Sequence, residues 1–493
     1  MDASSFVPTI GLEIHAELRT SSKMFCSCKN DPDEQKPNTN VCSICLGHPG
    51  TLPVLNKKAI EHVLRVGTAV NGTLADFTEW DRKNYFYPDI PKGYQISQFK
   101  YPLISGGELG GISVERIHLE EDTAQSTHDA HAKSLVNFNR AGVPLMELVT
   151  KPVIHDAATA VRFAKELQLL LRYLGAGEAN MEKGEMRVEA NISIASPADT
   201  AAGKFGTKTE VKNLNSFRAV EKAIACELER QAALIAGGEK VVQETRGWDD
   251  ASGETFSQRS KESSHDYRYF PDPDLPKLKL SEIPEFSIES LRKEMPELPW
   301  IRRDRYKKDF GMTDKEAAVF VDSPEFAEYF EEVIGGFAGD AKRTKLATNY
   351  MLTDYYKLVK DAPADVSGEN SETASFSERL WSIPASSFAE LISMISVGEL
   401  SSRGAKDLLG ILFAEKGISA KSAAEKHGLM QKSDASDLLP AIEKVIADNA
   451  GVVAEYKAGK VASLQFLIGQ AMKATKGAGN PEVVKKLLVE KLL

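Results

Sequence analysis

A proline-rich segment divides this 493-residue chain into two parts of different character. Six prolines fall between Pro271 and Pro299, and proline interrupts both helices and strands. Before this segment, short runs alternate apolar and polar residues with the period of a β-strand, whereas after it the pattern is helical. A chain of this length is expected to hold more than one domain. We therefore predict an α+β protein with a mixed α/β N-terminal domain and a helical remainder.

The N-terminal part alternates most clearly over residues 9–18, where Glu13 and His15 share one strand face and apolar residues take the other. Residues 186–194 and 206–217 carry further strand faces of Glu, Lys, Arg and Asn. Helices are expected over about 57–71, over 157–174 after the N-cap Asp156, and from the N-cap Ser216 to about residue 234. Such repeated polar faces indicate a sheet that lines a polar cradle. A solvated outer face is the alternative for residues 9–18.

Carboxylates gather in residues 116–147. Glu120, Glu121 and Asp122 are adjacent, and the chain then returns through Arg140 to Glu147, which lies in an apolar run. Adjacent carboxylates repel one another unless a cation or a proton intervenes, and hard oxygen ligands suit Mg²⁺. The alternative is a solvated acidic turn beside a surface strand. The alternation over residues 111–119 is too irregular to decide which of Glu120 and Glu121 faces inward.

Aromatic and basic residues interleave between Asp81 and Phe99, in the segment DRKNYFYPDIPKGYQISQF that contains Lys83. Aromatic rings with nearby cations can stack a base and hold phosphate. The same residues can equally form the core of a small sheet with charged rims, and the sequence leaves both interpretations open.

Four of the five cysteines form two close-set pairs, C-x-C and C-x-x-C, with 13 residues between the pairs. The spacing of Cys26, Cys28, Cys42 and Cys45 is typical of a tetrahedral structural zinc site. Two disulfides are the alternative, which a cytosolic chain disfavours. The intervening loop has little apolar content, so a bound metal would tie it down. We predict a zinc knuckle.

The C-terminal end is basic although the whole chain carries a net charge of −10. Seven lysines and three glutamates lie between Glu455 and Leu493. Lys473 and Lys476 adjoin a glycine-rich turn that could approach a nucleic-acid backbone closely. Lysine also favours helix C-termini, so a solvated helix end is the alternative.

Other signals are missing from the sequence. No run of about 18 apolar residues is present, so we expect no membrane span. The N-terminus, MDASSFVPTIG, has neither a basic n-region nor an apolar h-region, and we expect a cytoplasmic protein. Neither a P-loop nor a strand followed by G-x-G-x-x-G occurs, so any use of ATP would proceed without those phosphate-binding loops.

Several long motifs, spread in order over nearly the whole chain, resemble the B subunits of the bacterial-type aminoacyl-tRNA amidotransferases. They are GLEIHAEL (11–18), DRKNYFYPD (81–89), YQISQF (94–99), HLEED (118–122), R-x-G-x-P-L-x-E (140–147), KNLNSF (212–217), DYRYFPDPD (266–274) and FLIGQAMKATKGAGNP (466–481).

The resemblance implies a three-subunit enzyme that converts Glu-tRNA(Gln) to Gln-tRNA(Gln), or Asp-tRNA(Asn) to Asn-tRNA(Asn). The B subunits of that family use ATP and Mg²⁺ to phosphorylate the esterified side-chain carboxylate. Ammonia channelled from an amidase-family glutaminase partner then displaces phosphate, and a small third subunit surrounds the other two. The family's fold implies a cradle domain over residues 1–295, a helical domain over 296–405 and a small all-α, tRNA-binding tail domain over 406–493.

The resemblance also implies roles for individual residues. The family's Mg²⁺ ligands correspond to His15, Glu121 and Glu147, which selects Glu121 over Glu120. Lys83 corresponds to a lysine that pairs with the metal-site glutamate. The predicted site residues are, as catalytic groups, Glu13, Lys83, Asp122 and Arg140; as Mg²⁺ ligands, His15, Glu121 and Glu147; as zinc ligands, Cys26, Cys28, Cys42 and Cys45; and as tRNA contacts, Lys473 and Lys476.

Two other classes of function remain open on the residues alone. One is a zinc-containing RNA-binding protein without chemistry, and the other is a metal-dependent hydrolase that activates water with His15 and the carboxylates. ATP consumption that depends on charged tRNA would separate the synthetic enzyme from both. The sequence does not decide between the two tRNA substrates, nor which residues contact adenine.

Overall fold

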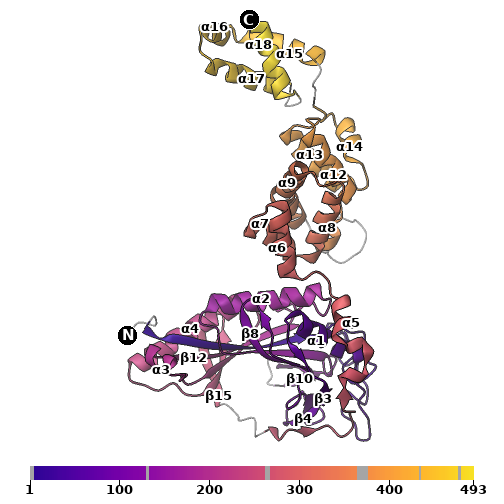
Figure 1. Ribbon diagram of the computed structural model, residues 1–493, viewed down its shortest axis with the longest axis vertical. Coiled ribbons are helices and arrows are strands. Elements are labelled where there is room, and N and C mark those ends of the chain that lie inside the picture. Colours follow the sequence, from indigo (N-terminus) through magenta and orange to yellow (C-terminus); the bar gives the residue numbers. More distant parts are fainter. Residues whose placement is uncertain are drawn as a thin grey trace. The chain divides into compact units, whose positions relative to one another are not determined.

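The computed structural model describes residues 5–128, 133–260, 267–362, 376–431, 435–475 and 479–492. The chain falls into two compact units, Met1–Pro299 and Trp300–Leu493 (Figure 1). Unit 1 contains a large sheet with helices, and the described part of unit 2 is helical apart from short bridges. The mixed sheet-and-helix N-terminal part and the helical C-terminal part are confirmed.

The described residues of unit 1 form one large sheet in the order β15-β14-β13-β12-β1-β11-β8-β6-β2, and β7 pairs with β8 at one end. Within this sheet, as far as the structure describes it, only the pairing of β13 with β14 is parallel. The strands are β1 (Val7–Glu17), β2 (Thr73–Leu74), β6 (Ile104–Ser105), β7 (Glu108–Leu109), β8 (Ile112–Glu121), β11 (Pro144–Thr150), β12 (Met186–Ala195), β13 (Thr209–Leu214), β14 (Glu244–Asp249) and β15 (Glu254–Ser260).

The two faces of this sheet differ because its strands alternate. On β1, Ile10, Leu12 and Ile14 are fully buried, whereas Glu13 and His15 point to the opposite face. Helices α1 (Lys57–Ala69), α2 (Ala157–Tyr173) and α4 (Phe217–Ala236) contact the sheet. Figure 1 shows α2 and α4 along one side of the long strands, with the small strands β3 and β4 on the other side. The polar face is therefore the face that these helices leave uncovered.

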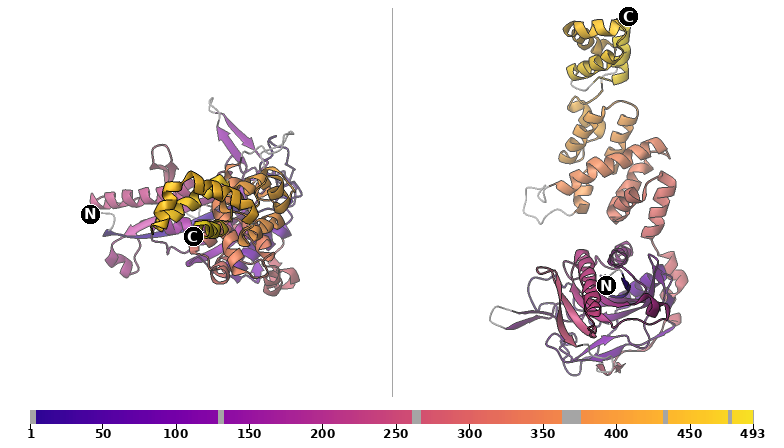
Figure 2. Two further views of the ribbon diagram at one scale, coloured as in Figure 1. Left: turned by 90° about the horizontal axis from the view of Figure 1, so that it is seen from above. Right: turned by 90° about the vertical axis from the view of Figure 1, so that its left-hand side faces the viewer.

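Smaller elements complete unit 1. A three-stranded sheet pairs β16 (Phe270–Pro271), β4 (Asp81–Asn84) and β5 (Tyr94–Ser97), and a two-stranded sheet pairs β17 (Leu278–Lys279) with β3 (Phe77–Thr78). The hairpin of β9 (Gln125–His128) and β10 (Ser134–Asn137) projects from the rest of the unit in both views of Figure 2. The remaining helices are α3 (Pro197–Ala201), α5 (Ile288–Lys293) and the short 3-10 turns Leu280–Glu282 and Pro284–Phe286.

The predicted helix starts are confirmed by their capping bonds. Asp156 accepts a hydrogen bond from the backbone N–H of Thr159 at 2.7 Å, and Ser216 accepts one from Ala219 at 3.0 Å. These bonds satisfy backbone donors that have no partner within the first helical turn. Both helices thereby begin where their side chains can pack on the apolar face of the sheet.

Unit 2 contains two groups of helices. The first is α6 (Pro299–Phe310), α7 (Asp314–Val321), α8 (Pro324–Gly335), α9 (Ala341–Tyr350), a π-helical turn (Met351–Tyr355), α10 (Tyr356–Asp361), α11 (Phe376–Leu380), α12 (Ala385–Ser396), α13 (Ser402–Ala414) and α14 (Ala420–Lys426). The second is α15 (Ala435–Asp448), α16 (Ala450–Lys457), α17 (Ala462–Ala474) and α18 (Pro481–Leu492). An aromatic core that includes Tyr306, Phe330 and Tyr355 is buried in the first group.

The second group has an apolar core of its own. Leu438, Ile442, Leu467 and Leu488 are buried together at the centre of that core. The proposed division of the helical part at residue 405 stays a prediction. No helix among the described residues is both long and apolar enough to cross a membrane.

Candidate functional site

Four charged or imidazole side chains form a row across the polar face of the large sheet. His15 on β1 lies opposite Arg187 on β12 and opposite Glu147 on β11. Glu147 in turn lies opposite His118 on β8. Directly opposed residues of antiparallel neighbours share a face. Pairing register thus brings together residues that are far apart in the sequence.

Two residues of this row, His15 and Glu147, lie close to Glu120, and we call these three residues the first acidic group. The Nε2 atom of His15 lies 3.4 Å from a carboxylate oxygen of Glu147 and 3.7 Å from one of Glu120. His118 places its Nε2 atom 3.1 Å from Glu147. The potential ligand atoms of His15, Glu120 and Glu147 all lie within 4.8 Å of one another. That spacing is compact enough for one cation.

The electrostatics of the first group favour positive charge at its centre. Burial disfavours a charged imidazole, but hydrogen bonding to Glu147 and the charges of Glu147, Glu189 and Glu120 outweigh it and raise the pKa of His15 to about 9. Burial also opposes ionisation of Glu147, yet His118 and His15 hold its pKa well below the usual value. The Nδ1 atoms of both histidines are buried without a hydrogen-bond partner among the described residues. Either a proton or a metal ion could supply the positive charge.

Glu121 does not join this group, contrary to the ligand set that the family resemblance implied. Glu121 follows Glu120 on the same strand, so its side chain points to the opposite face of the sheet. There its Oε1 atom accepts a hydrogen bond from the backbone N–H of Ile96 at 2.9 Å and pairs with Lys92. The lysine that reaches Glu121 is Lys92, whereas the resemblance implied that Lys83 pairs with the metal-site glutamate.

A second acidic group lies on the same polar face. The carboxylates of Glu13, Glu189 and Glu210 have oxygen atoms within 4.8 Å of one another. Lys212 lies 2.7 Å from Glu189, and Thr245 donates a hydrogen bond of 2.8 Å to Glu210. The predicted site residues include only Glu13 of this group. The polar alternation of residues 186–194 and 206–217 is the sequence signal for the other two.

Both acidic groups line one cavity of about 500 Å³. Four cations also line it: Lys83, Arg116, Arg187 and Lys212. Burial opposes the charge of Lys83, but Glu120, together with Tyr269 and Glu147, raises the pKa of its ammonium group. Lys83 therefore stays protonated beside the first acidic group. A cavity with carboxylates and fixed cations is suited to phosphate with divalent metal.

Asp122 and Arg140 form an ion-pair cluster with Glu17 and Arg187 beside the cavity. The guanidinium of Arg140 lies 2.6 Å from Asp122 and 3.0 Å from Glu17, and Arg187 lies 3.2 Å from Asp122. Burial and the charge of Asp122 raise the pKa of Glu17 to about 9. Asp122 lines the cavity, whereas Arg140 is not among the lining residues that the structure describes. Asp122 therefore links Arg140 to the cavity.

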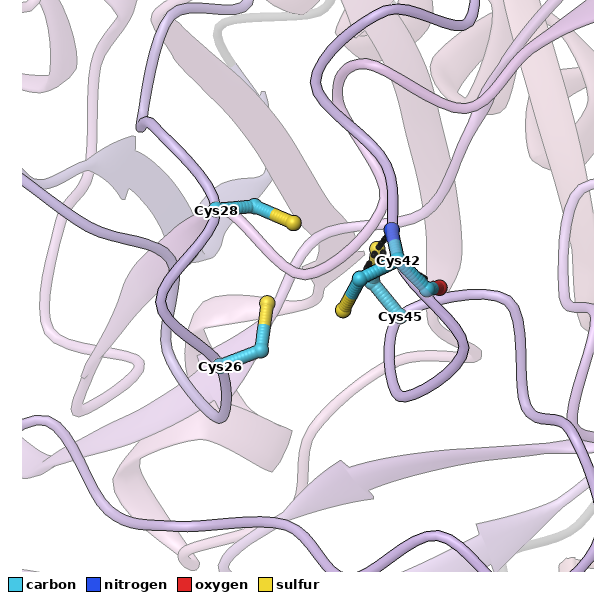
Figure 3. Close-up of side chains that lie close together, drawn as sticks. All are labelled: Cys26, Cys28, Cys42 and Cys45. Atoms are coloured by element: carbon cyan, nitrogen blue, oxygen red, sulfur yellow. Dashed lines mark hydrogen bonds between the residues drawn. The ribbon is translucent and has the colours of Figure 1, made fainter.

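The four predicted zinc ligands converge although they come from two separate turns (Figure 3). Their sulfur atoms all lie within 4.8 Å of one another, and none of these cysteines is in a disulfide. The pKa of the Cys45 thiol is lowered to about 5, first by its hydrogen bond with Cys26 and also by one from the backbone N–H of Cys42. Four converging thiols, one of them readily ionised, suit a tetrahedral metal.

The loop between the two cysteine pairs is hydrogen-bonded to the segment that precedes Arg140. The side-chain oxygen of Asn139 accepts hydrogen bonds from the backbone N–H groups of Thr39 at 2.8 Å and Asn40 at 2.9 Å. Asn139 is fully buried, and the next residue is Arg140. The loop therefore supports the segment that carries the Asp122 ion-pair cluster.

The predicted tRNA contacts are only partly described. Lys473 lies in the last turn of α17. Lys476 lies outside the described residues.

Comparisons with known proteins agree along the whole chain. The family model of the GatB/GatE catalytic domain matches residues 8–284, and that of the GatB domain matches residues 328–492. The aspartyl/glutamyl-tRNA(Asn/Gln) amidotransferase B subunit of Thermodesulfovibrio yellowstonii is 41% identical over 489 residues, covering 97% of this chain and 98% of the relative. The protein of the same name from Myxococcus xanthus is 42% identical over 501 residues and covers 100% of both chains. With two family models and full-length relatives in agreement, the chain belongs to the family of aspartyl/glutamyl-tRNA(Asn/Gln) amidotransferase B subunits.

Proposed function

We propose that this chain uses ATP to amidate Glu-tRNA(Gln), Asp-tRNA(Asn) or both, within a complex that also contains a glutaminase and a small third subunit. The observation that carries this proposal is the shared cavity, which two carboxylate groups and four cations line. A cytoplasmic location is part of the proposal, because the products serve translation.

The reaction needs an activated carboxylate, since oxide is a very poor leaving group. We infer that a side-chain carboxylate oxygen of the esterified amino acid attacks the γ-phosphorus of ATP, and that the bond from that phosphorus to the bridging oxygen of ADP breaks. Ammonia then attacks the acyl carbon, phosphate leaves with both electrons of the carbon–oxygen bond, and a proton is lost from nitrogen to give the amide. Lys83, Arg116, Arg187 and Lys212 are placed to neutralise phosphoryl oxygens during the first step.

The described residues fit divalent metal in both acidic groups. His15, Glu120 and Glu147 would hold one Mg²⁺, and Glu13, Glu189 and Glu210 could hold a second. When bound, Mg²⁺ would supply charge neutralisation for the triphosphate and for the carboxylates themselves. Glu121 has no place in this proposal, because its carboxylate is held by Lys92 and Ile96 on the other strand face.

The ion-pair cluster has a positioning role in this proposal. Asp122 fixes Arg187 from one side and is itself fixed by Arg140. A guanidinium held in this way keeps its donors oriented toward a phosphate or carboxylate. We propose that Asp122 and Arg140 keep Arg187 directed into the cavity.

The test uses the chain purified together with its two partners. We expect ADP to form only when glutamyl-tRNA(Gln) or aspartyl-tRNA(Asn) is present, with amide formed in equal amount when glutamine is added. A protein that only binds RNA would retain tRNA without forming ADP. A hydrolase would release the amino acid from tRNA without needing ATP. Either of these two results would reject the proposal.

We also propose that Cys26, Cys28, Cys42 and Cys45 bind one structural zinc ion. The observation that supports it is the convergence of four free thiols within 4.8 Å. Two close-set pairs on polar turns with little apolar core need a cross-link to keep one conformation. A catalytic zinc would require an open coordination position, whereas four cysteine ligands fill the tetrahedron.

We expect metal analysis to find one zinc ion per chain, and Cys42→Ser to lose it. Loss of a structural metal belongs to the few changes that destabilise a domain strongly, so the free energy of unfolding of unit 1 should fall by about 4 kcal/mol. Cys226→Ser is the matched control, because Cys226 lies outside the group, and it should keep zinc and stability. Full zinc content in the Cys42→Ser protein would contradict the assignment.

We propose that the predicted tail domain, residues 406–493, binds tRNA through its α15–α18 group, with Lys473 as a phosphate contact. Among the described residues of the tail, Lys460 pairs with Glu455 and Lys491 with Glu443, whereas Lys473 is in no such ion pair. Lys473 lies in the last turn of α17, where a lysine is not required by any described ion pair.

Removal of residues 435–493 should weaken tRNA binding while glutaminase activity of the partner continues. We expect Lys473→Ala to weaken binding modestly and to reduce the slope of log affinity against log salt by about 1. Lys315→Ala is the control, because Lys315 is an exposed lysine of α7 outside the tail. Unchanged tRNA affinity after the truncation, measured by filter binding over a salt series, would reject this role for the tail.

A further inference from the structure

One wall of the cavity is aromatic, although most of the other lining residues are charged or polar. Phe99, Tyr267 and Tyr269 line this wall. The rings of Phe99 and Tyr269 stack with centroids 4.3 Å apart and planes inclined by 8°. Phe99 nevertheless keeps 54% of its surface exposed. An aromatic pair that served only as the core of the small sheet would be buried, so the sheet-core interpretation does not explain Phe99.

Hydrogen bonds from a side chain of the small sheet hold the backbone of this aromatic wall in place. The side-chain amide of Asn84 on β4 donates hydrogen bonds to the carbonyl oxygens of Tyr267 at 3.1 Å and Arg268 at 2.8 Å. Arg268 has a φ of +44°, a conformation that L residues rarely adopt. The two tyrosines on either side contact each other edge to face, with centroids 6.1 Å apart. A strained backbone clamped by a side chain indicates a set position for the rings.

The wall adjoins the first acidic group. The ammonium of Lys83 lies over the ring of Tyr267, 4.9 Å from its centroid. Burial raises the pKa of Tyr269 to about 12, and the charges of Glu120 and Glu147 add to the effect of burial while Lys83 opposes it. The phenol of Tyr269 is therefore neutral and lies within electrostatic reach of those two carboxylates. A ligand on this wall would have its polar end beside the first acidic group.

A flat, partly exposed ring next to phosphate-binding groups is the arrangement that holds a nucleotide base by stacking. The reaction brings two adenosines to the cavity, that of ATP and the 3′-terminal adenosine of the charged tRNA. In both, the base is joined through ribose to the reacting group, which is the triphosphate in one case and the aminoacyl ester in the other.

We propose that the stacked pair Phe99–Tyr269 is the subsite for the adenine base of one of these two adenosines. This inference rests on the proposed function and adds the substrate group that the aromatic wall receives. The ring face of the pair supplies the affinity, Asn84 positions it through the backbone, and Lys83 with the first acidic group receives the polar part of the same ligand.

The experiment uses the full-length chain in complex with its partners and two fluorescent probes. One is 2-aminopurine riboside triphosphate, and the other is charged tRNA in which 2-aminopurine replaces the terminal adenine. Stacking quenches 2-aminopurine, so we expect one probe to be quenched by the parent complex and released from quenching by Phe99→Leu and by Tyr269→Leu. Tyr269→Phe keeps the ring and should keep the quenching.

Kinetics give a second readout. We expect Phe99→Leu to raise the KM for the corresponding substrate, ATP or charged tRNA, by about 10-fold, with kcat close to the parent value. Phe256→Leu is the matched control, because Phe256 is also an exposed phenylalanine of unit 1, at 48%, but does not line the cavity. It should leave both KM values unchanged.

The outcomes are distinguishable. Quenching of the triphosphate probe identifies the adenine of ATP, and quenching of the tRNA probe identifies the terminal adenosine. Quenching of neither probe, or quenching that Phe99→Leu and Tyr269→Leu leave unchanged, overturns the inference. If a probe is quenched by the pair but the parent complex amidates no charged tRNA, the base subsite stands and the proposed function fails.

Discussion

Glu147→Gln is expected to reduce tRNA-dependent ADP formation by at least about 100-fold. Glu147 lies between His15 and His118, at 3.4 and 3.1 Å, and its carboxylate provides the negative charge that holds positive charge at the centre of the first acidic group. Glutamine has the same size and retains hydrogen bonding, but it cannot provide that charge. Glutamine hydrolysis by the glutaminase partner should continue, uncoupled from amide formation.

The measurement is ADP formation in the purified complex with saturating charged tRNA, accompanied by circular dichroism to verify folding. Glu282→Gln is the control, because Glu282 is an exposed carboxylate of unit 1, with 71% of its side chain accessible, outside the cavity. Near-parent ADP formation by a folded Glu147→Gln protein would place the phosphoryl transfer elsewhere.

The adjacent pair Glu120 and Glu121 should respond in opposite ways to the same substitution. Glu120→Gln removes a charge from the first acidic group, so ADP formation should fall by about 100-fold with little change in stability. Glu121→Gln leaves the largely buried ammonium of Lys92, whose side chain is 12% accessible, without its charged partner, and an unpaired charge with little access to water is costly. We expect the free energy of unfolding to fall by about 3 kcal/mol, with ADP formation near the parent rate at low temperature.

Denaturant titration and ADP assays on the two proteins provide the comparison. The double variant Glu121→Gln with Lys92→Met removes both partners of the buried pair and should recover part of the lost stability. A Glu121→Gln protein that is as stable as the parent but inactive would restore Glu121 as the functional carboxylate. That result would reject the assignment of Glu120.

Strand periodicity was enough to predict the polar face of the sheet. Glu13 and His15 alternate with buried apolar residues, and the structure places them on one face as the period of two requires. The helix starts at Asp156 and Ser216 could also be predicted, because a capping side chain bonds to a residue only three positions away. Local rules therefore predicted the longest strands and helices of unit 1, including β1, β12, α2 and α4.

The pairing register between strands that are far apart in the sequence could not be predicted in the same way. Whether Glu120 or Glu121 faces His15 depends on how β8 pairs with β11, and a shift of one residue exchanges the two faces. The partnership of Lys92 with Glu121 and the meeting of Glu189 and Glu210 with Glu13 depend on the same kind of pairing. The strands that carry Glu13, Glu189 and Glu210 each showed a polar face in the sequence, but the sequence did not indicate which polar residues of different segments would meet.

The fate of oxygen in the substrate carboxylate tests the central claim most directly. Glutamyl-tRNA(Gln) or aspartyl-tRNA(Asn) with ¹⁸O in the side-chain carboxylate is amidated by the complete complex with ATP and glutamine, and the inorganic phosphate is analysed by mass spectrometry. Transfer of the γ-phosphoryl group to the carboxylate predicts one ¹⁸O atom in each phosphate released per amide formed. Amide formed with ¹⁸O-free phosphate would contradict phosphorylation of the carboxylate and, with it, the role proposed for the cavity.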